Sequence, residues 1–87
     1  MPKSIINSQL RRRVLVIERR VRFIYPPHLL DKPIIYDFGK KFDVVTNILE
    51  ANVTLQQGRL LLSIRGEEEV IEQGLAWVSE QGVIVER

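Results

Sequence analysis

The order in which strand-like and helix-like segments follow one another most constrains the fold of this chain. Residues 19–25 alternate between two kinds of side chain, which is typical of a strand with one face in solvent. The apolar set is Val21, Phe23 and Tyr25, and the basic set between them is Arg20 and Arg22. Pro26 and Pro27 end this strand, because neither residue has a backbone N–H to donate to a sheet.

Two later segments have the spacing of helices. Pro33 suits the first turn of a helix that runs through Lys41, and the apolar residues of this segment are Ile34, Ile35, Phe38 and Phe42. Three glutamates at 67–69 are favoured by the positive end of a helix dipole and open a second helix. Its apolar stripe is Val70, Ile71, Leu75 and Val78, with Gly74 and Trp77 at the border. Gly82 is suited to the position just after the helix.

Three further segments have the composition of strands. Residues 44–55 are rich in β-branched side chains, and an apparent apolar face carries Val45, Leu49, Ala51, Val53 and Leu55, with Asn47 among them. Residues 56–58 form a short turn, and 59–65 return as a strand. The three consecutive leucines at 60–62 indicate burial on both faces, and therefore a central position in the sheet. Residues 83–85 form a last short strand.

The resulting order, β-α-β-β-α-β, predicts an α+β protein of the ferredoxin-like arrangement. Two helices are expected to cover one face of a four-stranded antiparallel sheet. We expect the second face to associate with a partner, because an uncovered apolar sheet face favours association.

Charge is distributed unevenly along the chain. Residues 1–32 carry eight basic and two acidic side chains, a net charge of +6, whereas residues 33–87 carry five basic and nine acidic side chains, a net charge of −4. We expect residues 1–12 to form a basic N-terminal arm and residues 13–87 to form the domain.

The composition gives little support to catalysis. The chain has no cysteine, which excludes disulfides, thiolate chemistry and iron–sulfur ligation. His28 is the only histidine and has no evident companions for a metal site, so we expect neither metal nor cofactor and no enzymatic activity. No apolar run has the roughly 18 residues of a membrane span, and a cytoplasmic protein is expected.

Residues 33–86 resemble the NIL domain, a small ferredoxin-like module named for an Asn-Ile-Leu signature. The signature here is Asn47-Ile48-Leu49, followed by Ala51. The surroundings are also similar: Pro33, the run Lys40 to Val44, Gly66, Leu75-Ala76-Trp77, Gln81-Gly82-Val83 and Val85-Glu86.

The resemblance implies a regulatory domain akin to ACT domains. NIL domains occur at the C-terminal end of the ATPase subunit of methionine importers, where they pair and bind methionine at the interface, and similar domains are fused to ferredoxins. Asn47 matches the ligand-contacting asparagine, Ile48 and Leu49 complete the signature, and Val53 matches a second lining position. This chain lacks a G-x-x-x-x-G-K-[ST] motif and cysteines, so neither an ATPase nor an iron–sulfur cluster accompanies the domain in this sequence.

Three hypotheses follow. The first is a homodimer that senses an amino acid such as methionine, in which Asn47 hydrogen-bonds the ligand or its counterpart in a second subunit. For Asn47 the alternative is a structural role in which it bonds local backbone. For the domain the alternative is a structural module whose sheet edge or face docks a ferredoxin or transporter partner. The least favoured hypothesis is nucleic-acid binding through Arg20 and Arg22, because the aromatic residues of that strand have the opposite parity and belong to the core.

Overall fold

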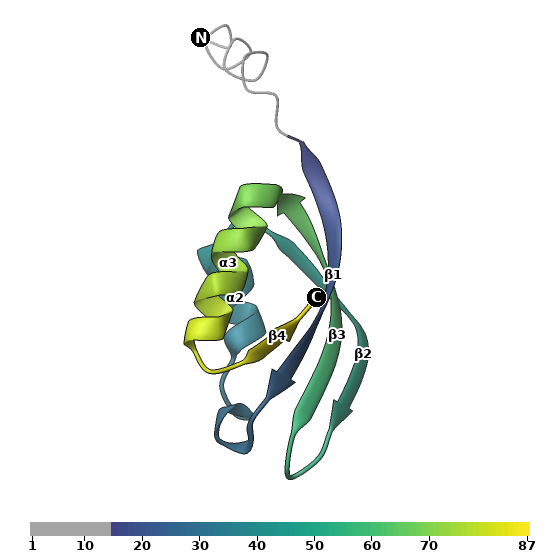
Figure 1. Ribbon diagram of the computed structural model, residues 1–87, viewed down its shortest axis with the longest axis vertical. Coiled ribbons are helices and arrows are strands. Elements are labelled where there is room, and N and C mark those ends of the chain that lie inside the picture. The colour runs from purple at the N-terminus through teal and green to yellow at the C-terminus, as the bar shows by residue number, and fades with distance from the viewer. Residues whose placement is uncertain (1–14) are drawn as a thin grey trace, which may run out of the picture.

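The computed structural model describes residues 15–87 (Figure 1). The basic arm predicted for residues 1–12, and the first two residues of the predicted domain, lie outside the described residues. The remaining chain forms strands and helices in this order: β1 (Val16–Tyr25), a 3-10 turn η1 (Pro27–Leu29), α2 (Ile34–Lys41), β2 (Val45–Val53), β3 (Gly58–Glu67), α3 (Glu68–Glu80) and β4 (Ile84–Glu86).

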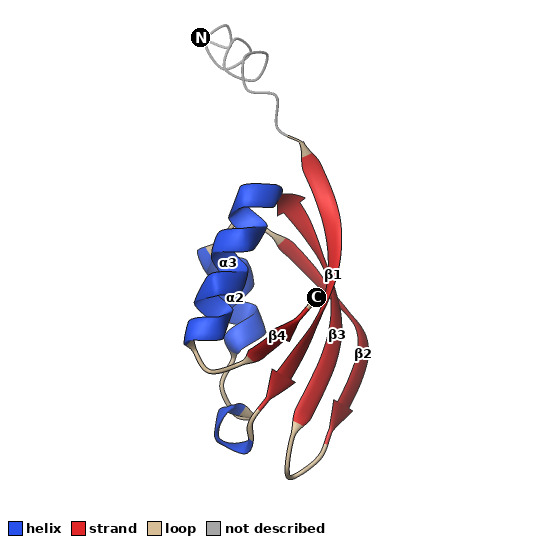
Figure 2. Ribbon diagram, viewed as in Figure 1, coloured by secondary structure: helices blue, strands red, loops and turns tan. Residues whose placement is uncertain are grey.

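The strands form a four-stranded sheet in the order β2-β3-β1-β4, and every neighbouring pair is antiparallel. Helices α2 and α3 lie on the same side of this sheet (Figure 2). The arrangement is the ferredoxin-like fold, which confirms the prediction from the order of the segments. The central position of β3, inferred from its three leucines, is also confirmed.

The register of the strands defines two faces of the sheet. Directly paired residues of antiparallel strands point to the same side. Val21 pairs with Leu62 and Phe23 with Leu60, and these side chains point toward the helices, on what we call the helix face. Arg20, Arg22 and their partners point the other way, to the open face. The predicted alternation of residues 19–25 is therefore confirmed.

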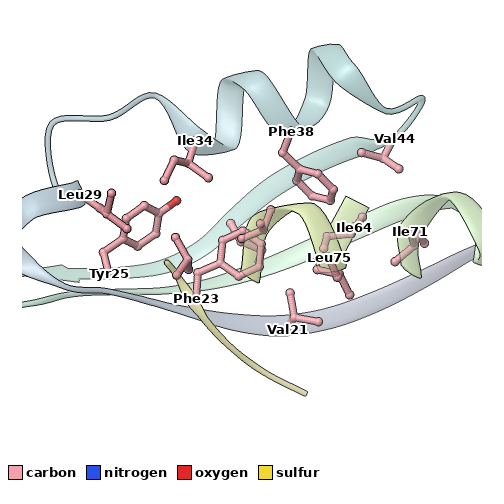
Figure 3. Packing of buried hydrophobic residues seen from close by; sticks show 13 residues of the cluster. Val21, Phe23, Tyr25, Leu29, Ile34, Phe38, Val44, Ile64, Ile71 and Leu75 are labelled. Carbon is pink, nitrogen blue, oxygen red and sulfur yellow. The ribbon is translucent and has the colours of Figure 1, made fainter. Parts of the chain in front are cut away.

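The core lies between the helix face and the two helices (Figure 3). Its buried members are Val21, Phe23, Tyr25, Leu29, Ile34, Phe38, Val44, Leu62, Ile64, Ile71, Leu75, Val78 and Val83. Phe38 is fully buried, and its ring lies 6.2 Å from that of Phe23 and 6.0 Å from that of Phe42, measured between centroids. Trp77 packs partly buried against this cluster, as expected.

The boundaries of the helices follow local chemistry. Pro33 occupies the N-cap of α2 rather than its first turn. Helix α3 begins at Glu68 with Glu67 at its N-cap, so the glutamate run opens the helix as predicted. Gly82 has a φ of +105°, a conformation that glycine adopts at little cost, and it reverses the chain into β4.

Arg19 lies on the helix face, unlike its neighbour Arg20. It pairs with Ile64 on the helix face, and its guanidinium donates to Glu68 at 3.0 Å and to Glu72 at 3.4 Å. Arg87 donates to Glu72 at 2.7 Å and, through this hydrogen bond, lowers the pKa of the Glu72 carboxyl. These pairs connect β1 and the C-terminal residue to α3, although such exposed pairs add little stability.

Candidate ligand site

All four residues of the predicted ligand set lie on β2. Asn47, Ile48 and Leu49 occupy its middle and Val53 its end. β2 is an edge strand that pairs with β3 along one side. In the part of the chain that the structure describes, no strand pairs with its other side, so its outward backbone groups are open to a partner.

Asn47 lies on the open face. It pairs with Ser63, which in turn pairs with Arg20 on β1. The buried Ser63 hydroxyl donates to Glu18 at 2.8 Å rather than to Asn47. The Asn47 side chain is exposed, so its amide is available to a ligand or to a second polypeptide.

A β-bulge separates the two ends of β2. Ile48 pairs with Leu62, but Glu50 pairs with the next residue, Leu61, so Leu49 is the extra residue. The pleat is therefore shifted by one residue after the bulge. The prediction that Asn47 and Val53 share a face is wrong for this reason. Residues Val45 and Asn47 lie on the open face, whereas Ala51 and Val53 lie on the helix face.

β2 exposes several apolar side chains. The exposed fraction is 59% for Val45, 55% for Ile48, 43% for Leu49 and 62% for Val53. An edge strand that stays free in solution usually carries charges or proline, and β2 carries Glu50 alone among ionisable residues. The bulge divides the strand into two short stretches, which restricts the register of any partner strand.

The open face as a whole carries both signs of charge. Arg20 and Arg22 lie there, as predicted, and Arg22 pairs with Glu86. By register the same face holds four arginines and four glutamates: Arg20, Arg22, Arg59 and Arg65 with Glu18, Glu50, Glu67 and Glu86. A balanced face lacks the excess positive charge of a phosphate-binding surface, which weighs against the nucleic-acid hypothesis.

Val53 also lines a pocket on the helix face. The pocket has a volume of about 200 Å³ and lies where the end of β2 approaches η1 and the start of α2. Its lining residues are Tyr25, Leu30, Lys32, Pro33, Ile34, Ile35, Tyr36, Val53, Gly58 and Leu60. Gly58 lies directly between Tyr25 and Val53 in the sheet, and the absence of a side chain there leaves room for Leu30, whose Cδ2 would lie 2.8 Å from a Cβ atom at Gly58.

Tyr25, a mostly buried residue, contributes a hydroxyl to this pocket. The residue is 6% exposed, and its hydroxyl is directed to the side of Ile34 (Figure 3). Burial raises the pKa of Tyr25 to about 12, and no hydrogen-bonding or charged neighbour among the described residues contributes to that rise. The hydroxyl is therefore neutral near pH 7 and able to donate a hydrogen bond.

The first turn of α2 also lines this pocket, with Ile34, Ile35 and Tyr36. Ile34 donates its N–H to the Lys32 carbonyl and Asp37 donates to the Pro33 carbonyl. In residues 15–87, the N–H groups of Ile35 and Tyr36 have no backbone carbonyl or capping side chain as acceptor. Unpaired N–H groups at a helix start attract negative charge.

Sequence reasoning included Val53 but missed Tyr25, Lys32 and the start of α2 as parts of one pocket. Pro33 did mark the helix start, and Pro26 marked the end of the strand that carries Tyr25. Neither signal indicates that these segments meet beside β2, because that proximity is set by the packing of α2 on the sheet.

The fold and the residue pattern define a small ferredoxin-like domain with an open edge strand. A comparison with family models adds the particular family: the model described as the NIL domain matches residues 19–87. The chain belongs to the NIL domain family. This confirms the resemblance inferred from the Asn-Ile-Leu signature and its surroundings.

Several proteins similar to this chain are methionine import ATP-binding proteins. The MetN protein of Coxiella burnetii is 33% identical over 70 residues, which cover 76% of this chain and 20% of the relative. MetN of Lactococcus lactis subsp. cremoris is 34% identical over 70 residues, which cover 76% of this chain and 19% of the relative. MetN 1 of Bacillus cereus is 39% identical over 51 residues, which cover 54% of this chain and 15% of the relative. The chain spans about a fifth or less of the length of these relatives.

Residues 15–87 provide neither a cluster of metal ligands nor a helix suited to crossing a membrane. Residues 15–87 contain no group of three or more His, Asp or Glu side chains arranged to hold a metal ion. Within the same residues, no helix has the length and apolar character needed to cross a membrane.

Proposed function

We propose that this domain is a non-catalytic, cytoplasmic regulatory module that binds methionine at an interface between two copies of the chain. The exposed apolar edge of β2 is the observation that carries the proposal, because it contains the Asn-Ile-Leu signature of the family. We choose methionine as the ligand because the relatives are named methionine import ATP-binding proteins.

The mechanism is a shift in population. A ligand that contacts two copies binds the paired state more tightly than the free chains, and so increases the fraction that is paired. By linkage, pairing tightens ligand binding by the same factor. The dimer then offers a different surface to whatever it regulates, and no chemical step on the ligand is required.

Asn47 is the polar contact in this proposal. Its amide carries two donors and an acceptor, and it is exposed in a strand whose other middle residues, Ile48 and Leu49, are apolar. In the dimer it contacts the ligand or the second copy, and in either case its loss weakens methionine binding.

Calorimetry with methionine tests the proposal. We expect the wild type to release or absorb heat on binding, and Asn47→Ala to bind about 10-fold more weakly, because a hydrogen bond contributes about 1 kcal/mol. Asn52→Ala is the matched control, since Asn52 lies on the same strand and by register on the same face. The sensing proposal fails if neither the wild type nor Asn47→Ala gives a heat of binding.

Docking of a separate protein is the second candidate function, and the unpaired edge of β2 also favours it. A segment of the partner would add a strand beside β2, with backbone hydrogen bonds as its main contacts. A pull-down from native cell extract, run beside the calorimetry, separates the candidates. A strand-adding partner is indicated by capture of one protein together with no heat from methionine.

A further inference from the structure

A groove on the outer surface of the two helices lies away from the strand that carries the Asn-Ile-Leu signature. Helix α2 lines it with Tyr36, Asp37, Lys40 and Lys41, and helix α3 lines it with Trp77. We call it the outer groove, and its volume is about 420 Å³. Of its lining residues only Tyr36 also lines the pocket beside β2. The outer groove is therefore a separate surface of the domain.

The outer groove contains aromatic side chains that the core does not enclose. The chain has six aromatic residues, and Phe23, Tyr25 and Phe38 are buried. Tyr36 is 64% exposed, because its position two residues before Phe38 turns it away from the sheet. Trp77 is partly buried, so one side of its ring is still open. Tyrosine and tryptophan are enriched at the centres of protein interfaces, which favours a protein partner for this groove.

Two lysines lie beside these rings. The Nζ atom of Lys40 is 5.5 Å from the ring centroid of Tyr36, and the Nζ atom of Lys41 is 5.9 Å from the ring centroid of Trp77. The attraction between an ammonium group and an aromatic ring holds both cations at the groove. Within residues 15–87 neither lysine forms an ion pair with a carboxylate, so each ammonium keeps donors for a partner.

The charge of the outer groove indicates an acidic partner. Its lining carries two lysines and one carboxylate, that of Asp37, and is therefore net positive. Residues 15–87 as a whole carry nine basic and eleven acidic side chains, so the groove is a cationic spot on an otherwise anionic domain. Separate carboxylates of a protein segment can contact this spot alone. A nucleic acid carries a continuous negative charge and would also meet the acidic surroundings.

We propose that the outer groove docks a short acidic segment of a partner protein. An apolar side chain of the segment packs against Tyr36 and Trp77, and its carboxylates accept hydrogen bonds from Lys40 and Lys41. Asn47 lies on the open face of the sheet, so the segment and a second copy of the chain can be bound at the same time. The proposal goes beyond the proposed function, since it requires neither methionine nor pairing.

Selection from a random-peptide library displayed on phage tests the chemistry of the partner. The library is first cleared of peptides that bind the Tyr36→Ala variant and is then selected on the full wild-type chain. We expect the enriched peptides to share an aliphatic or aromatic residue flanked by Asp or Glu. A consensus peptide without tryptophan is then titrated by fluorescence, because Trp77 is the only tryptophan of the chain. We expect added salt to weaken binding, since it screens exposed charges.

Variants of the groove test the location with the same peptide. We expect Tyr36→Ala to bind it at least about 10-fold more weakly, and Tyr36→Phe, which keeps the ring, to bind it within about 2-fold of the wild type. Lys40→Gln and Lys41→Gln should each weaken binding about 3-fold and reduce its dependence on salt. Lys32→Gln is the matched control, because Lys32 is also an exposed lysine but does not line the outer groove. Thermal unfolding confirms that each variant folds.

Four results would overturn the proposal. They are no enrichment after clearing, enriched peptides that lack Asp and Glu, lysine variants that bind as well as Lys32→Gln does, and a short oligothymidylate that binds more tightly than the peptide. The last result, if it also depends on Lys40 and Lys41, would assign the groove to nucleic acid. Calorimetry with methionine on the Lys40→Gln and Lys41→Gln variants should match the wild type, so failure of one proposal leaves the other unaffected.

Discussion

Replacing Gly74 with alanine is expected to lower the free energy of unfolding by about 1–3 kcal/mol. A methyl group at Gly74 would overlap Cε1 of Phe38 and lie 3.0 Å from its Cδ1. The ring cannot move aside easily, because Phe38 is fully buried and packs against Phe23 and Phe42. In a domain of this size each kcal/mol corresponds to about 4–8 °C in Tm, so thermal unfolding measures the effect.

Gly39 provides the matched control for this prediction. It also lies in a helix, but a Cβ atom there meets no other atom within 4 Å. Gly39→Ala is therefore expected to raise the unfolding free energy by about 0.5–1 kcal/mol, through the better helix propensity of alanine. The double variant with Phe38→Leu and Gly74→Ala should be more stable than the variant with Phe38→Leu alone. If Gly74→Ala stabilises the domain as Gly39→Ala does, the close packing of α2 on α3 is contradicted.

Ile48→Lys is expected to convert the proposed dimer into a monomer. Ile48 lies beside the middle of β2, so antiparallel pairing of two β2 strands brings it close to the second copy. A lysine on an edge strand opposes such pairing, and two like charges at one interface cost several kcal/mol. We expect the dissociation constant of the dimer to rise at least about 100-fold. Sedimentation equilibrium over a range of concentrations measures it.

The opposite edge of the sheet supplies the control for Ile48→Lys. Ile84 on β4 is 56% exposed and Ile48 is 55% exposed, so the same substitution has the same chemistry at both edges. Ile84→Lys should leave the dimer intact. Loss of the dimer in Ile84→Lys alone would move the interface to β4, and equal loss in both would point to a nonspecific effect of added charge.

The sequence predicts the order of the elements well because local signals mark most boundaries. Pro26 ends β1, the glutamates at 67–69 open α3, and Gly82 takes the left-handed conformation that its position after a helix suggests. The three leucines of β3 correctly indicated the central strand, but burial on both faces was wrong, because the open face of β3 carries Arg59, Arg65 and Glu67. The family could also be recognised from the sequence, because the residues around the Asn-Ile-Leu signature match the family as well.

The candidate site was harder to predict because it depends on packing. Val45, Asn47, Leu49, Ala51 and Val53 have odd numbers and look like one face of a regular strand. The bulge at Leu49 breaks this regularity, and no glycine or proline marks it. The pocket joins Tyr25, the start of α2 and Val53, which are distant in sequence and meet only when α2 packs on the sheet. The close contact of Gly74 with Phe38 likewise exists only in the folded domain.

The dissociation constant of the dimer, measured by sedimentation equilibrium with and without methionine, tests the central proposal most directly. Linkage requires that a ligand bound between two copies tightens their association, and we expect saturating methionine to lower the constant at least about 10-fold. A chain that stays monomeric at all concentrations, or a dimer whose constant is the same with and without methionine, would contradict the proposal that two copies bind this ligand together.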